Sequence, residues 1–90
     1  MKIEVSFSSS FRRAFKKRVK GKTDLEVRFW AKVETFTNEP FAPSLKTHKL
    51  SGKLKDLWSF TLEYDERVLF YFTDDKNAVF VDIGNHDEVY

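Results

Sequence analysis

Along the chain, the spacing of hydrophobic residues changes from period two to the helical period and back, which divides the sequence into predicted elements. Residues 2–7 alternate between apolar and polar positions, as a half-buried strand does. Residues 11–19 then carry an apolar stripe at helical spacing, made of Phe11, Ala14, Phe15 and Val19. Serines at 8–10 offer an N-cap to this helix, and Gly21 should end it. Arg18 falls beside the stripe, where its aliphatic stem can pack.

A second helical stripe follows a short turn. It consists of Leu25, Phe29, Val33 and Phe36, with Trp30 at its margin. Thr23 and Glu26 have the spacing of a capping box, so we expect Thr23 to be the N-cap. Pro40 and Pro43 cannot continue a helix, so this helix should stop near Asn38 and a loop should follow. The two helical segments predict a helical hairpin.

Three further segments have the apolar content of strands, at 57–64, 68–72 and 78–83. Short polar connections join them, which predicts an antiparallel meander. Because two helices precede this sheet and must bury their stripes against it, the predicted fold class is α+β, with the order βααβββ. The two-helix hairpin should pack on a mainly antiparallel sheet. With 90 residues there is room for one domain, so 1–90 should form a single unit.

The composition excludes several classes of protein. The chain has no cysteine, which excludes a disulfide framework and a thiolate metal site and fits a reducing compartment. No apolar run has the length of a signal peptide core or of a membrane span, so we expect a cytoplasmic protein with no membrane partner.

The net charge of +2 conceals a strong asymmetry along the chain. Residues 1–55 carry fourteen Lys and Arg against five acids, whereas residues 56–90 carry two against nine. A basic surface of this kind can bind nucleic acid or an acidic partner, although it can also be a solvated surface alone. In the predicted loop, the candidates for RNA backbone contacts are Lys46, Lys49, Lys53 and Lys55.

The candidate chemistry is acid–base chemistry without a metal or cofactor. His48 and His86 are the two histidines, and neither lies at metal-ligand spacing from another ligand. Nucleophile-elbow, phosphate-loop and dinucleotide motifs are absent. Imidazole titrates near neutrality and suits proton transfer. Gly84 should let the chain leave its strand abruptly and place His86 and Tyr90 at the end of the sheet. The alternative, which the residue types alone favour, is that these two decorate a turn and a chain end.

Arg67 stands at the start of an otherwise apolar strand. It can bind a phosphate through two parallel hydrogen bonds, or it can pair with Asp65 or Glu63. Trp58 can stack on a base, but its alternation with apolar neighbours favours a place in the core.

Three motifs in this order resemble one known family. They are L-x-x-H-x-L-x-G at 45–52, Asp65-x-Arg67 before an apolar strand, and G-x-H-x-x-x-Y at 84–90. Together with the βααβββ order, they resemble the RelE/ParE toxin superfamily, especially its RelE-like and YafQ-like mRNA interferases. The resemblance implies a toxin of a type II toxin–antitoxin module that enters the ribosomal A site and cuts mRNA. A cognate antitoxin would hold it inactive in a hetero-oligomer.

The resemblance also implies roles for individual residues. The catalytic positions would be His48, Asp65, Arg67, His86 and Tyr90. Because RNA carries its own nucleophile, the 2′-hydroxyl, the protein has to remove one proton, stabilise the phosphate and protonate the leaving oxygen. His48 would be the base, His86 the acid and Arg67 the phosphate ligand, with the two histidine roles open to exchange. Tyr90 would stack on or orient the base.

The sequence departs from the family pattern at one position. Where YafQ-like toxins have a histidine in the second strand of the sheet and RelE-like toxins a nearby lysine, this chain has Thr61 with Ser59. Thr61 favours a catalytically weakened protein, and a binding toxin of the same fold is a further possibility, so two alternatives to the nuclease stay open. One is a ParE-like inhibitor that binds DNA gyrase without cutting nucleic acid, and the other is a catalytically weakened RelE-like remnant.

Overall fold

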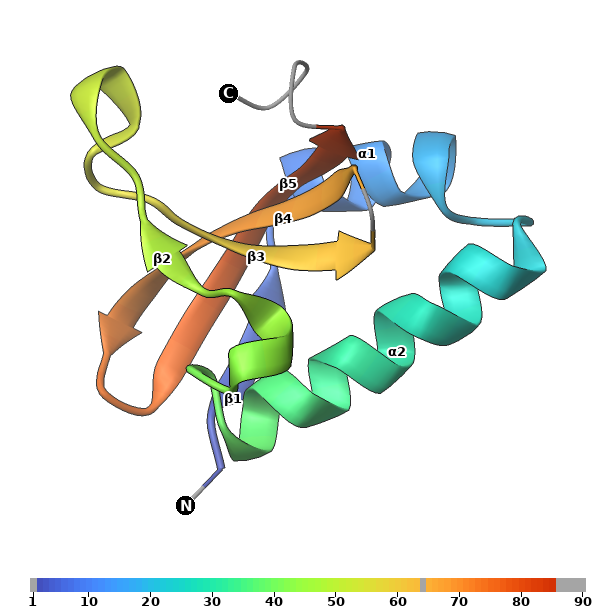
Figure 1. Ribbon diagram of the computed structural model, residues 1–90. Helices are drawn as coiled ribbons and strands as arrows, with labels where there is room; N and C mark the ends of the chain where they lie inside the picture. Colours follow the sequence, from blue (N-terminus) through green and yellow to red (C-terminus); the bar gives the residue numbers. More distant parts are fainter. Residues whose placement is uncertain (1, 64, 86–90) are drawn as a thin grey trace.

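The described residues form two α-helices and one five-stranded sheet (Figure 1). The computed structural model describes residues 2–63 and 65–85. Its elements are β1 (Glu4–Phe7), α1 (Ser9–Arg18), α2 (Thr23–Asn38), β2 (His48–Lys49), β3 (Trp58–Glu63), β4 (Glu66–Asp74) and β5 (Asn77–Asn85), with short 3₁₀ turns η1 (Pro43–Leu45) and η2 (Gly52–Leu54). The strand order is β1-β5-β4-β3-β2, with β1 parallel to β5 and the other neighbours antiparallel. The predicted α+β class is confirmed.

The structure adds one strand to the predicted order. The two-residue strand β2 lies at the edge of the sheet and pairs with the start of β3. Two residues are too few to show a period in the sequence, so the pattern predicted only a loop here. This short strand matters for the site because it contains His48.

Aromatic rings fill the core between the helices and the sheet. Phe36 on α2 is fully buried, and it contacts the rings of Phe60, Phe70, Phe72 and Phe80. Phe11 on α1 and Phe29 on α2 contact each other and both reach Phe80. Trp58 is half-buried against Phe41 and Phe72, which confirms its predicted place in the core. Both predicted helical stripes therefore face the sheet.

The helix ends confirm one predicted cap and correct the other. Ser8 is the N-cap of α1, and its Oγ accepts a hydrogen bond from the backbone N–H of Phe11 at 3.1 Å. The predicted capping box at Thr23 is wrong, because Lys22 is the N-cap of α2 and makes no side-chain cap bond. Gly21 adopts a left-handed conformation with a φ of 87°. After this turn, α2 begins at Thr23, one residue before the start that a Thr23 N-cap predicts. The end of α2 at Asn38 is as predicted.

At the other end of the sheet, the structure corrects the role of Gly84. The strand β5 continues through Gly84 to Asn85, so the predicted abrupt exit at Gly84 is wrong. Gly84 lies directly opposite Arg67 of β4, and the ladder between the two strands keeps the chain extended there.

The β4–β5 hairpin closes through Asp74, whose carboxylate accepts hydrogen bonds from the Lys76 backbone and the Asn77 side chain. These bonds stabilise the charged carboxylate and so lower the pKa of Asp74, with the Lys76 bond the larger cause and the Asn77 bond the second. Within the described part of the chain, no helix is long and apolar enough to cross a membrane.

Candidate functional site

Two of the predicted site residues, His48 and Arg67, lie on the same face of the sheet. His48 is paired with Ser59 across β2 and β3, and Arg67 is paired with Thr61 across β3 and β4. Residues directly opposite each other share a face, and so do residues two apart on one strand. We call this the outer face and define it by His48, Ser59, Thr61 and Arg67. It lies opposite the face whose core residues pack against the helices.

The spacing on the outer face suits a single nucleotide linkage. Neighbouring strands are about 4.8 Å apart and residues two apart on a strand about 6.7 Å apart. The Cα atoms of His48 and Arg67 are therefore about 12 Å apart, with Ser59 and Thr61 between them. Side chains of this length can reach a common group from such positions. Ser59 is fully buried and Thr61 half-buried. The surface between His48 and Arg67 is therefore made of small side chains.

His48 is exposed, and its ring is oriented by the preceding turn. Its Nδ1 lies 3.0 Å from the carbonyl oxygen of Lys46. A carbonyl can only accept a hydrogen bond, so Nδ1 carries the proton in this contact, and the lone pair of the neutral ring is then on Nε2. Lys46 adopts a left-handed conformation with a φ of 51° at the end of η1. That turn aims its carbonyl at the imidazole.

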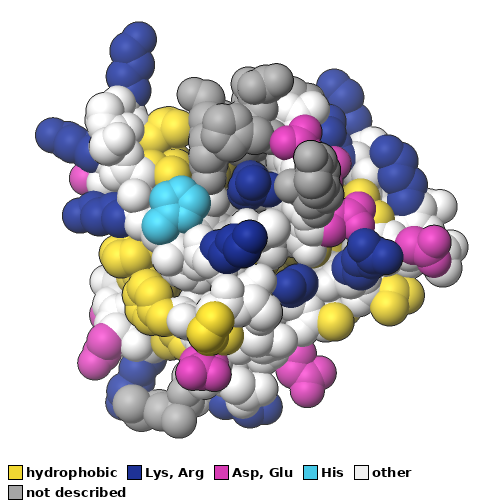
Figure 2. Space-filling view, in the orientation of Figure 1, with side chains coloured by type: hydrophobic (Ala, Val, Ile, Leu, Met, Phe, Trp, Pro, Cys, Tyr) yellow, Lys and Arg dark blue, Asp and Glu magenta, His cyan; other side chains and the backbone are white. Residues whose placement is uncertain are grey.

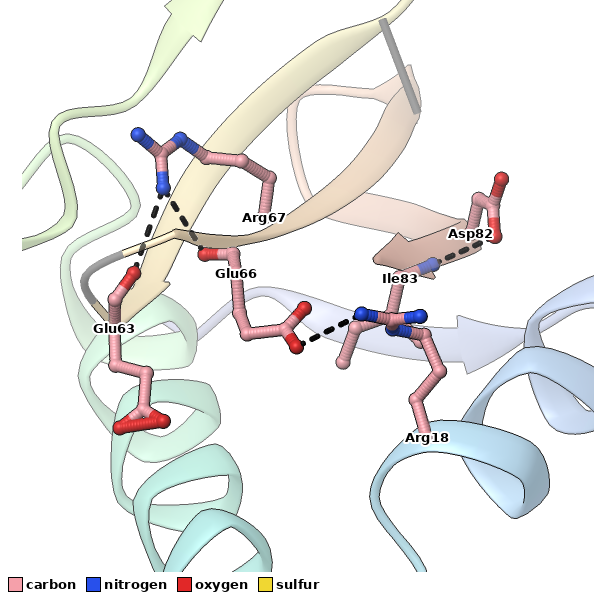
Figure 3. Close-up of polar contacts among 6 residues, drawn as sticks. All are labelled: Arg18, Glu63, Glu66, Arg67, Asp82 and Ile83. Carbon is pink, nitrogen blue, oxygen red and sulfur yellow. Dashed lines mark hydrogen bonds and ion pairs between the residues drawn. The ribbon is translucent and has the colours of Figure 1, made fainter. Parts of the chain in front are cut away.

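Arg67 is half-buried and makes contacts with backbone carbonyls (Figure 3). Its Nη1 donates to the carbonyl of Glu63 at 3.4 Å and to that of Glu66 at 3.3 Å. The carboxylate of Glu63 bonds to Arg28 at 2.6 Å instead. The alternative of a salt bridge from Arg67 to the Glu63 side chain is therefore wrong, because that side chain turns toward α2. The register shift between Thr61 and Glu63 accompanies this turn.

The remaining predicted site residues are at the rim or outside the described residues. Asp65 is exposed in the connection just before β4. His86 and Tyr90 lie outside the residues that the structure describes. The four predicted RNA-binding side chains are exposed between α2 and β3: Lys46, Lys49, Lys53 and Lys55. Figure 2 shows Lys and Arg side chains gathered around a histidine on the surface of this view, and His48 is exposed.

Nearly the whole chain matches one known protein family. Residues 3–90 match the model of a family described as the bacterial toxin of type II toxin–antitoxin systems, YafQ. The chain belongs to the YafQ toxin family. No curated protein matches it as a relative.

Solved structures show the same toxin fold. The chain is 27% identical to a metal-bound toxin from Helicobacter pylori, with 98% of this chain and 99% of that one covered and a TM-score of 0.74. It is 20% identical to YafQ from E. coli, with 98% of each chain covered and a TM-score of 0.69. A chain of the RelBE2 toxin–antitoxin complex from Mycobacterium tuberculosis is 19% identical, with coverage of 96% and 100% and a TM-score of 0.63. The family match confirms the resemblance to YafQ-like toxins, and these structures show that the chain has the fold of RelE-like toxins.

This toxin has a second distinctive surface, which the sequence did not reveal. A groove of about 360 Å³ lies between α1 and α2, and we call it the aromatic groove. It is lined by Phe7, Phe11, Arg12, Phe15, Lys16, Lys20, Glu26, Phe29 and Trp30. Its floor is aromatic and its rim carries three cations and one acid. Trp30 is 49% exposed there, a large fraction for a side chain of that size.

Proposed function

We propose that this YafQ-family toxin is a ribosome-dependent endoribonuclease that cleaves mRNA without a metal ion or cofactor. The observation that carries the proposal is the strand register, which puts His48 and Arg67 on the outer face on either side of β3. An imidazole and a guanidinium are the two groups that cleavage through the 2′-hydroxyl needs most. The exposed lysines between α2 and β3 would contact the RNA backbone.

The proposed reaction uses the nucleophile that RNA supplies. Nε2 of His48 removes the proton of the 2′-hydroxyl, and the 2′-oxygen attacks the adjacent phosphorus. Arg67 stabilises the negative charge that develops on the phosphate oxygens. His86 gives a proton to the departing 5′-oxygen, which leaves a 2′,3′-cyclic phosphate and a free 5′-hydroxyl. The histidine roles can be exchanged, and Asp65 and Tyr90 would orient the histidines and the base.

Induced expression of the toxin followed by primer extension on a cellular transcript tests this function. We expect new 5′ ends inside the translated reading frame within minutes of induction. The control is the same transcript with its start codon removed, which ribosomes do not translate. It should stay intact, because the proposed enzyme meets its substrate in the ribosomal A site.

Other outcomes of this experiment would overturn the proposal. Equal cleavage of both transcripts would contradict the dependence on the ribosome. Intact transcripts together with arrested DNA replication would favour the ParE-like inhibitor of gyrase. Intact transcripts with unaffected growth would favour a catalytically weakened remnant.

We further propose that the aromatic groove binds an acidic amphipathic segment of the cognate antitoxin. A toxin of a type II system has an antitoxin partner, and the two would form a hetero-oligomer in the cytoplasm. The rim cations Arg12, Lys16 and Lys20 fit acidic side chains, while the aromatic floor fits large apolar anchors. The groove and the outer face lie on opposite sides of the sheet, so the antitoxin would leave the cleavage face uncovered at this contact.

Substitutions of two neighbouring lysines test whether the aromatic groove binds the antitoxin. Lys16 lines it and Lys17 does not, although both are exposed on α1. Lys16→Glu should weaken binding of the protein encoded by the adjacent short reading frame, and Lys17→Glu should leave it nearly unchanged. Trp30→Ala should weaken binding by about 30-fold or more, as the loss of an interface anchor does. Titration by calorimetry measures all three. Equal effects of the two lysine variants would show that only net charge matters.

A further inference from the structure

The two carbonyls that hold Arg67 belong to residues whose side chains are each bonded to a helix. The carboxylate of Glu66 accepts a hydrogen bond from Arg18 of α1 at 3.1 Å. The carboxylate of Glu63 accepts one from Arg28 of α2 at 2.6 Å. Figure 3 shows Glu66 between Arg18 on one side and Arg67 on the other. The connection between β3 and β4 is thus attached to both helices.

We propose that these two ion pairs position the guanidinium of Arg67, and that Arg18 and Glu66 are its main positioning residues. This inference rests on the proposed function for its catalytic consequence. The backbone of Glu63 and Glu66 has to stay in place for its carbonyls to meet Nη1 at 3.4 and 3.3 Å. With Nη1 held in this way, the rotation of the guanidinium is restricted. A guanidinium held in one orientation would meet a bound phosphate in a fixed geometry.

The Arg18–Glu66 pair is better suited to this role than the Arg28–Glu63 pair because it is less exposed. The side chains of Arg18 and Glu66 are 23% and 18% exposed, whereas that of Arg28 is 61% exposed. Exposed ion pairs contribute little, because water and salt screen them and long side chains lose entropy. The Oε2 atom of Glu66 is buried and accepts no hydrogen bond from the described residues, so this carboxylate depends on Arg18.

The Arg18–Glu66 ion pair also connects helix α1 to the start of β4, where Arg67 lies. Arg18 is the last residue of α1, and Glu66 is the first residue of β4 and lies next to Arg67 in sequence. Small displacements of a catalytic group are costly, since a misplacement of about 1 Å can lower a rate by about 100-fold. A contact 48 residues apart in sequence can therefore affect the cleavage rate without touching RNA.

Steady-state kinetics of mRNA cleavage by the full chain test the proposal. The effect of each ion-pair substitution on kcat should depend on whether Arg67 is present. Glu66→Gln keeps the backbone carbonyl but removes the charge, and Arg18→Met removes its partner. Each should lower kcat by about 10- to 100-fold and leave KM nearly unchanged, because binding of the ribosome and mRNA does not need an exact guanidinium orientation. In an Arg67→Ala background neither substitution should lower kcat further. Arg13→Met, on the exposed side of α1, is the control and should have no effect.

A second measurement keeps the proposal separate from the nuclease proposal. In the NMR spectrum of the free toxin, restricted rotation should give the two Nη groups of Arg67 distinct resonances, assigned by their loss in Arg67→Lys. These resonances should merge in Glu66→Gln. Distinct resonances in Glu66→Gln, or an equal loss of kcat with and without Arg67, would overturn the positioning role. A wild-type toxin that shows the resonances but cuts no RNA would overturn the nuclease and leave the positioning of Arg67 intact.

Discussion

Replacement of His48 by Ala should lower the rate of mRNA cleavage by about 100- to 10,000-fold, the range contributed by a positioned base or acid. The hydrogen bond from Nδ1 to the Lys46 carbonyl leaves the lone pair of the neutral ring on Nε2, the atom that we propose as the base. Cleavage of a translated transcript by purified toxin and ribosomes, followed over time, measures the loss. The side chain is exposed, so the substitution should cost little folding stability.

His48→Asn separates proton transfer from the orientation of the turn. The side-chain amide of Asn can donate to the Lys46 carbonyl as Nδ1 does, but it cannot act as a base. We expect this variant to be as slow as His48→Ala. A rate near that of the wild-type toxin in His48→Asn would assign His48 a structural role, and the base would then have to be another group, with His86 the first candidate.

The elements of the fold could be predicted from the sequence because burial imposes a visible period on it. The stripe at Leu25, Phe29, Val33 and Phe36 identified α2, and its last residue could be placed near Asn38 from the prolines that follow. The cap of α2 could not be predicted, because Thr23 and Glu26 have a plausible local spacing and the turn at Gly21 overrides it. A local sequence pattern does not show how the preceding turn leads into the helix, and that turn determines which residue is the N-cap.

The residues of the candidate site were selected from sequence motifs, but their arrangement could not be predicted. The motif around His48 has no period, so the short strand β2 and its pairing with Ser59 became visible only in the sheet. The left-handed Lys46 that orients the imidazole is a conformation that lysine rarely adopts, and the sequence gives no sign of it. His86 and Tyr90 stay predictions, because they lie outside the described residues.

The ion pair between Arg18 and Glu66 shows a further limit of sequence reasoning. The helical period predicts that Arg18 lies beside the apolar stripe with a packed stem, which agrees with its half-buried position. No spacing rule connects it to a residue 48 positions away. The pairing follows only from the way α1 crosses the end of the sheet. A contact between residues so far apart in sequence leaves no periodic pattern, so it can be found only from the structure.

Replacement of Arg67 by Ala should lower the cleavage rate by about 100- to 1,000-fold, the effect of removing one donor that stabilises charge in a transition state. The loss should appear in kcat more than in KM, because the exposed lysines would still bind the RNA backbone. Arg67→Lys keeps the charge but lacks the planar fork of donors, so its rate should lie between those of Arg67→Ala and the wild-type toxin. Single-turnover cleavage on programmed ribosomes measures the three rates.

Thermal unfolding of the same proteins separates this effect from a loss of structure. Arg67 is half-buried and bonded to the Glu63 and Glu66 carbonyls, so Arg67→Ala leaves these acceptors without their donor and should lower Tm modestly. Assays well below that Tm then compare folded enzymes. A variant that stays folded and cleaves at the wild-type rate would remove Arg67 from the reaction. The pairing of His48 and Arg67 on one face would then be a feature of RNA binding alone, and charge stabilisation would have to come from the lysines of the loop between α2 and β3.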